Sequence, residues 1–253
     1  MNLSKIQKLV TDNNGIYIKT KHLGVSHARN TGLRMLNGEL ICLLDSDDSW
    51  LETKLEKQVK YHQENKYLIS QTREIWYKNN KKINIIDKLK PTLGEQFVDS
   101  LRLCKISSSS VALNIEVFQN LGGYKQELTV CEDYDFWIRA TQQYEIGLVD
   151  EELVVKHGGA PDQLSKKYKA MDRYRLYSLI YFLNQNFNDL DEDKIISLNE
   201  EILNKINILY QGSLKHNIKM SEYYENLLKI FNEDDLCTSV LTRELANILN
   251  ILD

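Results

Sequence analysis

An apolar stretch that stops at three carboxylates constrains this chain more than any other feature. Residues 40–44 are apolar and long enough for a strand, and Asp45, Asp47 and Asp48 follow directly. Side chains two positions apart on an extended strand point to the same side, so Asp45 and Asp47 can converge where the strand ends. Three acids this close repel one another unless a cation, hydrogen-bond donors or water screen them.

This pattern predicts a site for a hard cation and a diphosphate. Carboxylate oxygens on a loop after a buried strand suit Mg²⁺ or Mn²⁺, and such ions keep positions open for substrate phosphates. In open α/β sheets, ligands bind in the crevice beyond the carboxyl ends of the strands. A competing interpretation is an acidic loop in front of a helix, with Ser49 as the N-cap. The stretch alone leaves both interpretations open.

The order of helical and extended patterns predicts an α/β fold with a mostly parallel sheet. Helices alternate with strands up to residue 77, and Leu51, Leu55, Val59 and His62 form one stripe of a helix over 51–65. The expected helices and strands of this first part are helix 2–10, strand 16–20, helix 28–36, strand 40–44, helix 51–65 and strand 67–77. After an irregular excursion over 78–91 we expect helix 93–104, strand 111–113, helix 115–121, a helix starting near 131, and strands 146–149 and 153–155.

From about residue 166 the pattern predicts helices only. Apolar residues recur at helical spacing over 168–187, 193–210, 220–231 and 236–252. We therefore expect an α/β domain over residues 1–165 and a helical C-terminal region over 166–253.

Composition narrows the class of function and the compartment. The net charge is −4 and there is no long basic run, which argues against nucleic-acid binding. The four cysteines show no C-x-x-C spacing, which favours a reduced, cytoplasmic protein. No signal-peptide core and no apolar run of about 20 residues are present. Peripheral contact with the inner face of the membrane stays open.

Four motifs, in this order, resemble those of one enzyme family. They are Gly24-Val25-Ser26-x-Ala28-Arg29-Asn30-x-Gly32, Asp45-x-Asp47-Asp48, Gly122-Gly123-Tyr124 and Glu132-Asp133-x-Asp135-Phe136-Trp137-x-Arg139. Over roughly residues 5–160, their order and spacing resemble the inverting family 2 glycosyltransferases of the GT-A fold. The Gly-Gly-x-Pro-Asp-Gln-Leu-Ser segment at 158–165 is similar to one in bacterial members.

The resemblance implies a nucleotide-diphosphate sugar as the donor. Asp45 and Asp47 would bind Mn²⁺ or Mg²⁺ and the ribose-diphosphate region, with Asp47 as the more direct metal ligand. His157 falls where relatives place a further metal or diphosphate contact. Arg29 and Asn30 fall in the donor-binding segment, and a guanidinium suits phosphate.

The resemblance also assigns the acceptor chemistry. Asp133 matches the general base that takes the proton of an acceptor hydroxyl, and Glu132 beside it belongs to the donor-binding set. The acceptor would be a glycan, a lipid-linked sugar or a protein, because relatives commonly build bacterial cell-surface glycans. The opposing interpretation is that Glu132 and Asp133 are simply favoured by a helix dipole.

The chain departs from the family at its front, and this departure opens two other functions. Relatives begin with a strand, a helix and a second strand, whereas this chain begins at the helix that follows. We expect that these strands lie upstream, have been lost from the gene, or come from a partner chain. An inactive, non-catalytic partner protein is therefore one alternative. The other is a haloacid dehalogenase-type phosphohydrolase with Asp45 as nucleophile and Asp47 as acid-base, although Ser49 departs from that motif.

Overall fold

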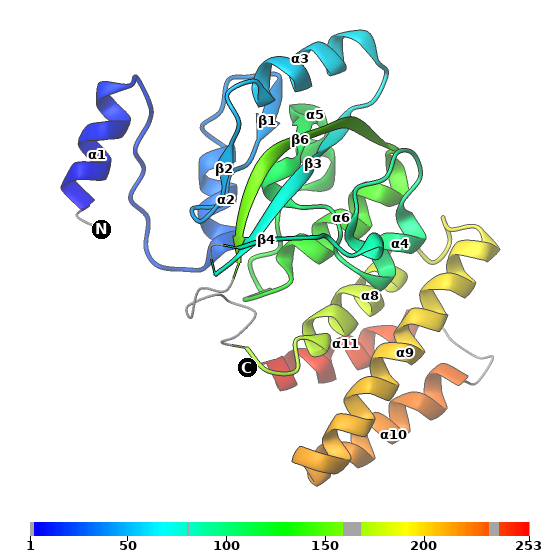
Figure 1. Cartoon of the computed structure of the whole chain (residues 1–253). Helices are drawn as coiled ribbons and strands as arrows, with labels where there is room; N and C mark the ends of the chain where they lie inside the picture. Colours follow the sequence, from blue (N-terminus) through cyan, green and yellow to red (C-terminus); the bar gives the residue numbers. More distant parts are fainter. Residues whose placement is uncertain (1–2, 80, 159–167, 233–237, 253) are drawn as a thin grey trace.

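The computed structural model describes residues 3–79, 81–158, 168–232 and 238–252, and it confirms the α/β class with a helical C-terminal part (Figure 1). The first part contains α1 (Leu3–Asp12), α2 (Val25–Leu33), β1 (Leu40–Cys42), β2 (Ser49–Trp50), α3 (Lys54–Glu64), β3 (Ile69–Lys78), β4 (Lys81–Ile83), the 3₁₀ turn η1 (Asp87–Leu89), α4 (Phe97–Arg102), the 3₁₀ turn η2 (Ser108–Ser110), β5 (Ala112–Asn114), α5 (Ile115–Leu121), α6 (Glu132–Gln143) and β6 (Ile146–Gly158). The helical part contains α8 (Asp172–Asn186), α9 (Glu192–His216), α10 (Ile218–Asn232) and α11 (Thr238–Leu252).

The sheet is mixed rather than mostly parallel. Its described strands lie in the order β1-β5-β3-β6-β2, and β4 pairs with the C-terminal end of β3, at 76–78. Only β3 and β6 pair in parallel, and the other described pairs are antiparallel. The expected strand directions were wrong for β2, β4 and β5, which run opposite to β1, β3 and β6. For β4 the cause is local, because a tight hairpin returns the chain directly after β3.

Residues 16–20 form no strand, contrary to expectation. They are extended and mostly exposed, and no described strand pairs with them. β-branched and aromatic residues favour strands only where a neighbour completes the hydrogen bonds and packing. Local composition alone was therefore insufficient to predict whether residues 16–20 form a strand.

Helix α3 forms as predicted, but it buries a polar face. Leu51, Leu55 and Val59 are 41–47% exposed, whereas Lys54 and Gln58 are fully buried. Gln58 donates to Ser70 Oγ and to the carbonyl of Ser110, and Lys54 donates to Gln58. Buried polar groups are tolerated when they are hydrogen-bonded, so partners in the sheet and not hydrophobicity decide which face turns inward.

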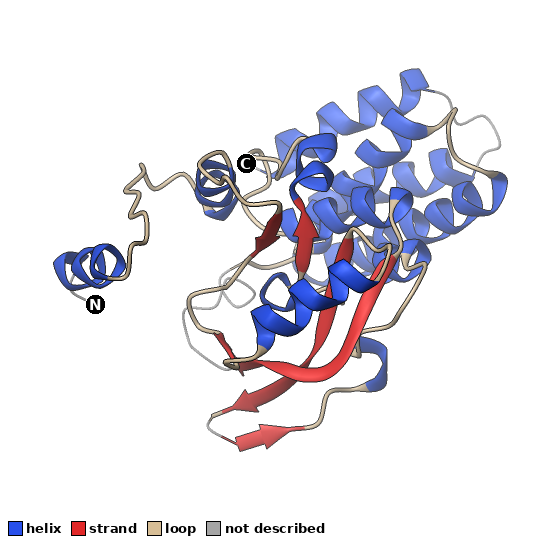
Figure 2. Ribbon diagram, turned by 90° about the horizontal axis from the view of Figure 1, so that it is seen from above, coloured by secondary structure: helices blue, strands red, loops and turns tan. Residues whose placement is uncertain are grey.

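The C-terminal helices pack against the α/β part through a shared apolar core. Phe97 on α4 and Tyr134 and Ile138 on α6 belong to the same buried cluster as residues of α8–α11. The helices gather as one bundle at one end of the molecule (Figure 2). The predicted boundary at 165 and most of the 158–165 segment lie outside the described residues. Among the described helices, none is long and apolar enough to cross a membrane.

Candidate functional site

The acidic loop between β1 and β2 is held from below by Ser109. The Ser109 hydroxyl donates to Asp48 Oδ2 at 2.6 Å and accepts from the Asp45 backbone N–H at 3.1 Å. The Trp50 indole N–H donates to the Ser109 carbonyl at 2.8 Å. Lys156 Nζ lies 3.2 Å from Asp48 Oδ2, and the Asp48 side chain is only 3% exposed. Asp48 therefore anchors the loop, whereas the Asp47 side chain is exposed.

Arg29 joins two of the motifs that are far apart in sequence. Its guanidinium donates to Asp45 Oδ1 at 2.8 Å and to Glu132 Oε1 at 2.7 Å. It also lies 5.2 Å from the centre of the Tyr124 ring. Burial would lower the pKa of Arg29, but the surrounding Tyr124, Glu132 and Asp45 outweigh it and raise the pKa. Arg29 is thus a permanent cation between two carboxylates.

The N-terminus of α6 presents the Glu132-Asp133 pair. Asp133 Oδ1 accepts from the Tyr134 backbone N–H at 2.7 Å, and a helix N-terminus favours negative charge. Burial, and next the charge of Asp133, raise the pKa of Glu132, while Arg29 opposes them. Asp45 and Asp133 line one cavity of about 140 Å³. The structure therefore brings the two predicted reactive carboxylates to one cleft.

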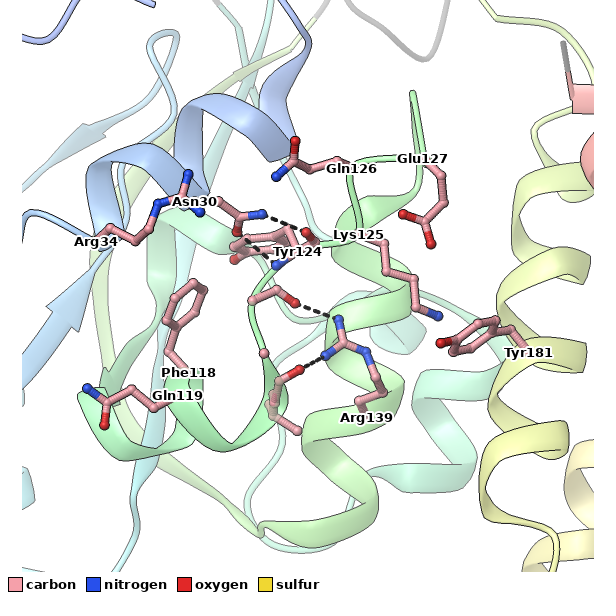
Figure 3. A pocket seen from close by; sticks show the side chains of 13 residues that line it. Asn30, Arg34, Phe118, Gln119, Tyr124, Lys125, Gln126, Glu127, Arg139 and Tyr181 are labelled. Atoms are coloured by element: carbon pink, nitrogen blue, oxygen red, sulfur yellow. Dashed lines mark hydrogen bonds between the residues drawn. The ribbon is translucent and has the colours of Figure 1, made fainter.

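The Gly122-Gly123-Tyr124 turn is clamped from two sides (Figure 3). The Asn30 amide donates to the Tyr124 carbonyl at 2.7 Å and accepts from the Tyr124 N–H at 2.9 Å. Arg139 donates to the carbonyls of Leu121 and Gly123, and also to Asp135. Asn30 thus has a structural role in this arrangement, and its assignment as a donor contact stays a prediction.

A larger hollow of about 720 Å³ lies beside this clamp (Figure 3). It is lined by residues of α2, α5, the glycine turn and α8, including Arg34, Lys125 and Tyr181. Asn30 also lines it, but Asp45 and Asp133 do not. The hollow is therefore separate from the cleft that holds the reactive carboxylates.

One of the predicted metal ligands, His157, does not line the cavity that Asp45 lines. Asp47 is exposed on the turn after Asp45, whereas the His157 ring stacks on Tyr77 with 5.7 Å between ring centres. The cavity lined by Asp45 includes Lys156 but not His157. Within the described ranges, no three His, Cys, Asp or Glu side chains form a group that could hold a metal. The oxygens of Asp45 and Asp47 nevertheless fit a hard cation that takes its other ligands from phosphate and water. The metal role of His157 stays a prediction.

Sequence reasoning missed several residues of this cleft. Ser109 and Lys156 hold the acidic loop, and Glu74 and Trp76 line the same cavity. The serine run at 107–110 indicated only an approach to a strand. These residues are found through the pairing of β3 with β6, which no local pattern reports.

Comparison with known proteins identifies the family. The model of "Glycosyl transferase family 2" matches residues 3–122. Residues 3–122, just under half of this chain, therefore match glycosyl transferase family 2. It is 32% identical over 140 residues to an uncharacterized glycosyltransferase of Rickettsia conorii, covering 54% of this chain and 22% of that protein. It is 28% identical over 131 residues to the Escherichia coli UDP-Glc:alpha-D-GlcNAc-diphosphoundecaprenol beta-1,3-glucosyltransferase WfaP, covering 51% and 49%.

Solved structures of glycosyltransferases confirm the GT-A fold. The crystal structure of S. aureus TarS 1-349 in complex with UDP-GlcNAc superimposes with a TM-score of 0.67, at 16% identity, over 90% of this chain and 68% of that one. The family assignment is one of transferases and argues against the phosphohydrolase alternative. The chain spans between about a fifth and three fifths of the length of the curated relatives that it matches.

Proposed function

We propose that this chain transfers a sugar from a nucleotide-diphosphate sugar to an acceptor hydroxyl, with inversion and with a divalent cation, in bacterial cell-surface glycan synthesis. One observation carries the proposal: Arg29 ties Asp45 to Glu132, and Asp45 shares a cleft with Asp133. The name of WfaP supports a UDP-sugar donor and a lipid-linked acceptor, and the TarS complex supports a UDP-sugar donor.

On the donor side, Asp45 and Asp47 would hold Mg²⁺ or Mn²⁺ together with the diphosphate. When bound, the cation would offset the charge of the departing nucleoside diphosphate. Asp48 keeps the loop in place through Ser109 and Lys156. Arg29 holds Asp45 and is charged at any physiological pH, so it orients the loop while adding positive potential near the diphosphate.

On the acceptor side, Asp133 acts as the general base. The acceptor oxygen attacks the anomeric carbon on the face opposite the diphosphate, the bond from that carbon to the diphosphate oxygen breaks, and Asp133 takes the hydroxyl proton. Attack from the opposite face inverts the anomeric configuration. Glu132 stays paired with Arg29, so the two neighbouring carboxylates have different roles.

Calorimetric titration with UDP, GDP and dTDP, with and without Mn²⁺, tests the donor site. We expect metal-dependent binding of one nucleotide that is lost in Asp47→Asn and retained in Asp133→Asn. Release of nucleoside diphosphate from its sugar, in the presence of bacterial lipid extract, should be lost in both variants. Asp189→Asn, at an exposed position in the turn before α9, is the matched control. Full turnover by both site variants would contradict the assignment.

A non-catalytic partner protein is the second candidate, and the open edge of the sheet favours it. In the described part of the chain, β1 ends the sheet and pairs only with β5. An uncovered edge can accept a strand from another chain. This role predicts no turnover with any donor, together with a specific complex formed along the β1 edge or through residues after about 166.

A further inference from the structure

Two residues of β3, Glu74 and Trp76, line the cleft that Asp45 and Asp133 also line. In the parallel pairing of β3 with β6, Glu74 lies opposite Val154 and Trp76 lies opposite Lys156. Paired residues share a face of the sheet, so Glu74, Trp76 and Lys156 point the same way. All three line the 140 Å³ cavity that Asp45 and Asp133 also line. They are therefore within the cleft, and Lys156 also contacts the acidic loop at Asp48.

Only one oxygen of the Glu74 carboxylate has a hydrogen-bond partner among the described residues. Its Oε2 accepts from the Trp76 indole N–H at 2.7 Å, while Oε1 has no hydrogen-bond partner among the described residues. The residue is only 5% exposed. A buried carboxylate oxygen without a donor is costly, and such a group in a binding cleft calls for a ligand that donates. Glu74 also contributes to the raised pKa of Lys156, which burial alone would lower.

The same two residues form the wall of a second hollow. This cavity, of about 420 Å³, is lined by Glu74 and Trp76 together with residues of β4 and of the segment over 84–91. Its charged rim residues are already paired, Lys82 with Glu152 and Lys90 with Asp87. The two cavities thus meet at one indole and one carboxylate, and the rim shows no uncompensated charge for an anion.

We propose that Glu74 and Trp76 bind the acceptor, and that the acceptor is a saccharide of at least two units lying across both cavities. Building on the proposed function, the unit with the attacking hydroxyl lies beside Asp133, and the next unit lies in the larger hollow. Glu74 Oε1 accepts a hydrogen bond from a sugar hydroxyl. The Trp76 indole, fixed by its bond to Glu74, packs against the apolar C–H face of a sugar ring. The hydrogen bond to Glu74 and the packing on Trp76 would be the same for free and for lipid-linked saccharides.

The test measures saccharide binding and nucleotide binding separately. An array of mono- to tetrasaccharides is probed with the full chain, and the best ligand is titrated by calorimetry against wild type, Glu74→Gln and Trp76→Phe. We expect a ligand of two or more units, with affinity at least tenfold weaker in Glu74→Gln, because a hydrogen bond to a charged group is lost. Trp76→Phe, which removes the indole N–H that donates to Glu74, should also weaken saccharide binding. Glu151→Gln, an exposed change on β6 outside both cavities, should have no effect.

The nucleotide titration distinguishes failure of the assignment of Glu74 and Trp76 from failure of the proposed function. UDP, GDP and dTDP are titrated with Mn²⁺ against the same variants, and we expect their affinity to be unchanged. If a nucleotide binds but no saccharide does, or if both cleft variants bind saccharide like wild type, the assignment of Glu74 and Trp76 is overturned while the donor site stands. If no nucleotide binds the folded chain, the proposed function itself fails. Thermal melts of each variant confirm that the fold is intact.

Discussion

Replacing Lys54 by Met should stabilise the protein near neutral pH and remove one component of its pH dependence. Lys54 is fully buried beneath the acidic loop. Its Nζ lies 4.3 Å from the centre of the Trp50 ring and donates to Gln58, but no carboxylate is paired with it among the described residues. Met fills a similar volume without a charge, so the variant should keep the packing under Trp50.

The magnitude follows from the pKa of the buried amine. Burial lowers the pKa of Lys54 from 10.5 to about 8. At about 1.4 kcal/mol per pH unit, the charged form costs the fold roughly 3 kcal/mol below pH 8. The unfolded chain keeps its proton up to about pH 10.5, so wild-type stability from this group rises between pH 8 and 10.5. The lost bond to Gln58 and the lost contact with Trp50 offset about 2 kcal/mol of the gain.

Urea unfolding at pH 7 and pH 10 measures the effect. We expect Lys54→Met to be more stable than wild type by about 1 kcal/mol at pH 7 and less stable by a similar amount at pH 10. Lys60→Met, on the same helix with a side chain that is 70% exposed, is the control and should show no such crossing. A difference between wild type and Lys54→Met that is identical at both pH values would refute the reasoning.

Three further substitutions test the contacts that hold the Gly122-Gly123-Tyr124 turn and the bridge that Arg29 forms between Asp45 and Glu132. Gly123→Ala places a Cβ 2.8 Å from Asn30 Oδ1 at a φ of +80°, and we expect a loss of roughly 1–3 kcal/mol in urea unfolding; an unchanged midpoint would contradict the clamp. Asp135→Asn leaves Lys125 and Arg139 without their buried carboxylate, and the same assay should show a loss of about 3–5 kcal/mol. Arg29→Lys keeps the charge but cannot reach both carboxylates, so calorimetry should show at least tenfold weaker nucleotide binding; wild-type affinity would argue against the bridge.

Short-range chemistry made much of the fold predictable. Helix α5 has the bounds expected from the sequence, because the Asn114 side chain caps its first turn and Gly122, at a φ of 72°, ends it in the left-handed conformation. The motif order likewise predicted that Asp45 and Asp133 belong to one site, and the shared cleft agrees with this. Phe136 and Trp137, the aromatic pair of the fourth motif, are buried in the core.

Contacts between separate segments of the chain decided features that local sequence patterns could not predict. The apolar stripe of α3 faces solvent because the Gln58 amide finds acceptors in Ser70, 12 residues away, and Ser110, 52 residues away. Likewise, Glu74 and Trp76 reach the cleft only because β3 pairs with β6, and this register includes shifts around Arg73 that realign the strand. A period-2 pattern shows that alternate residues share a face, but it does not show which face meets the site.

The position of Arg29 suggests why the motifs of this family appear together. Its two bonds connect the carboxylate that would meet the donor, 16 residues away in sequence, with the N-terminus of α6, 103 residues away. Asp133 is the next residue after Glu132 on a helix whose Asp135 is fixed by Arg139, and Arg139 also holds the glycine turn. The proposed base therefore lies in a segment that Arg29 holds at Glu132 and that Arg139 holds at Asp135.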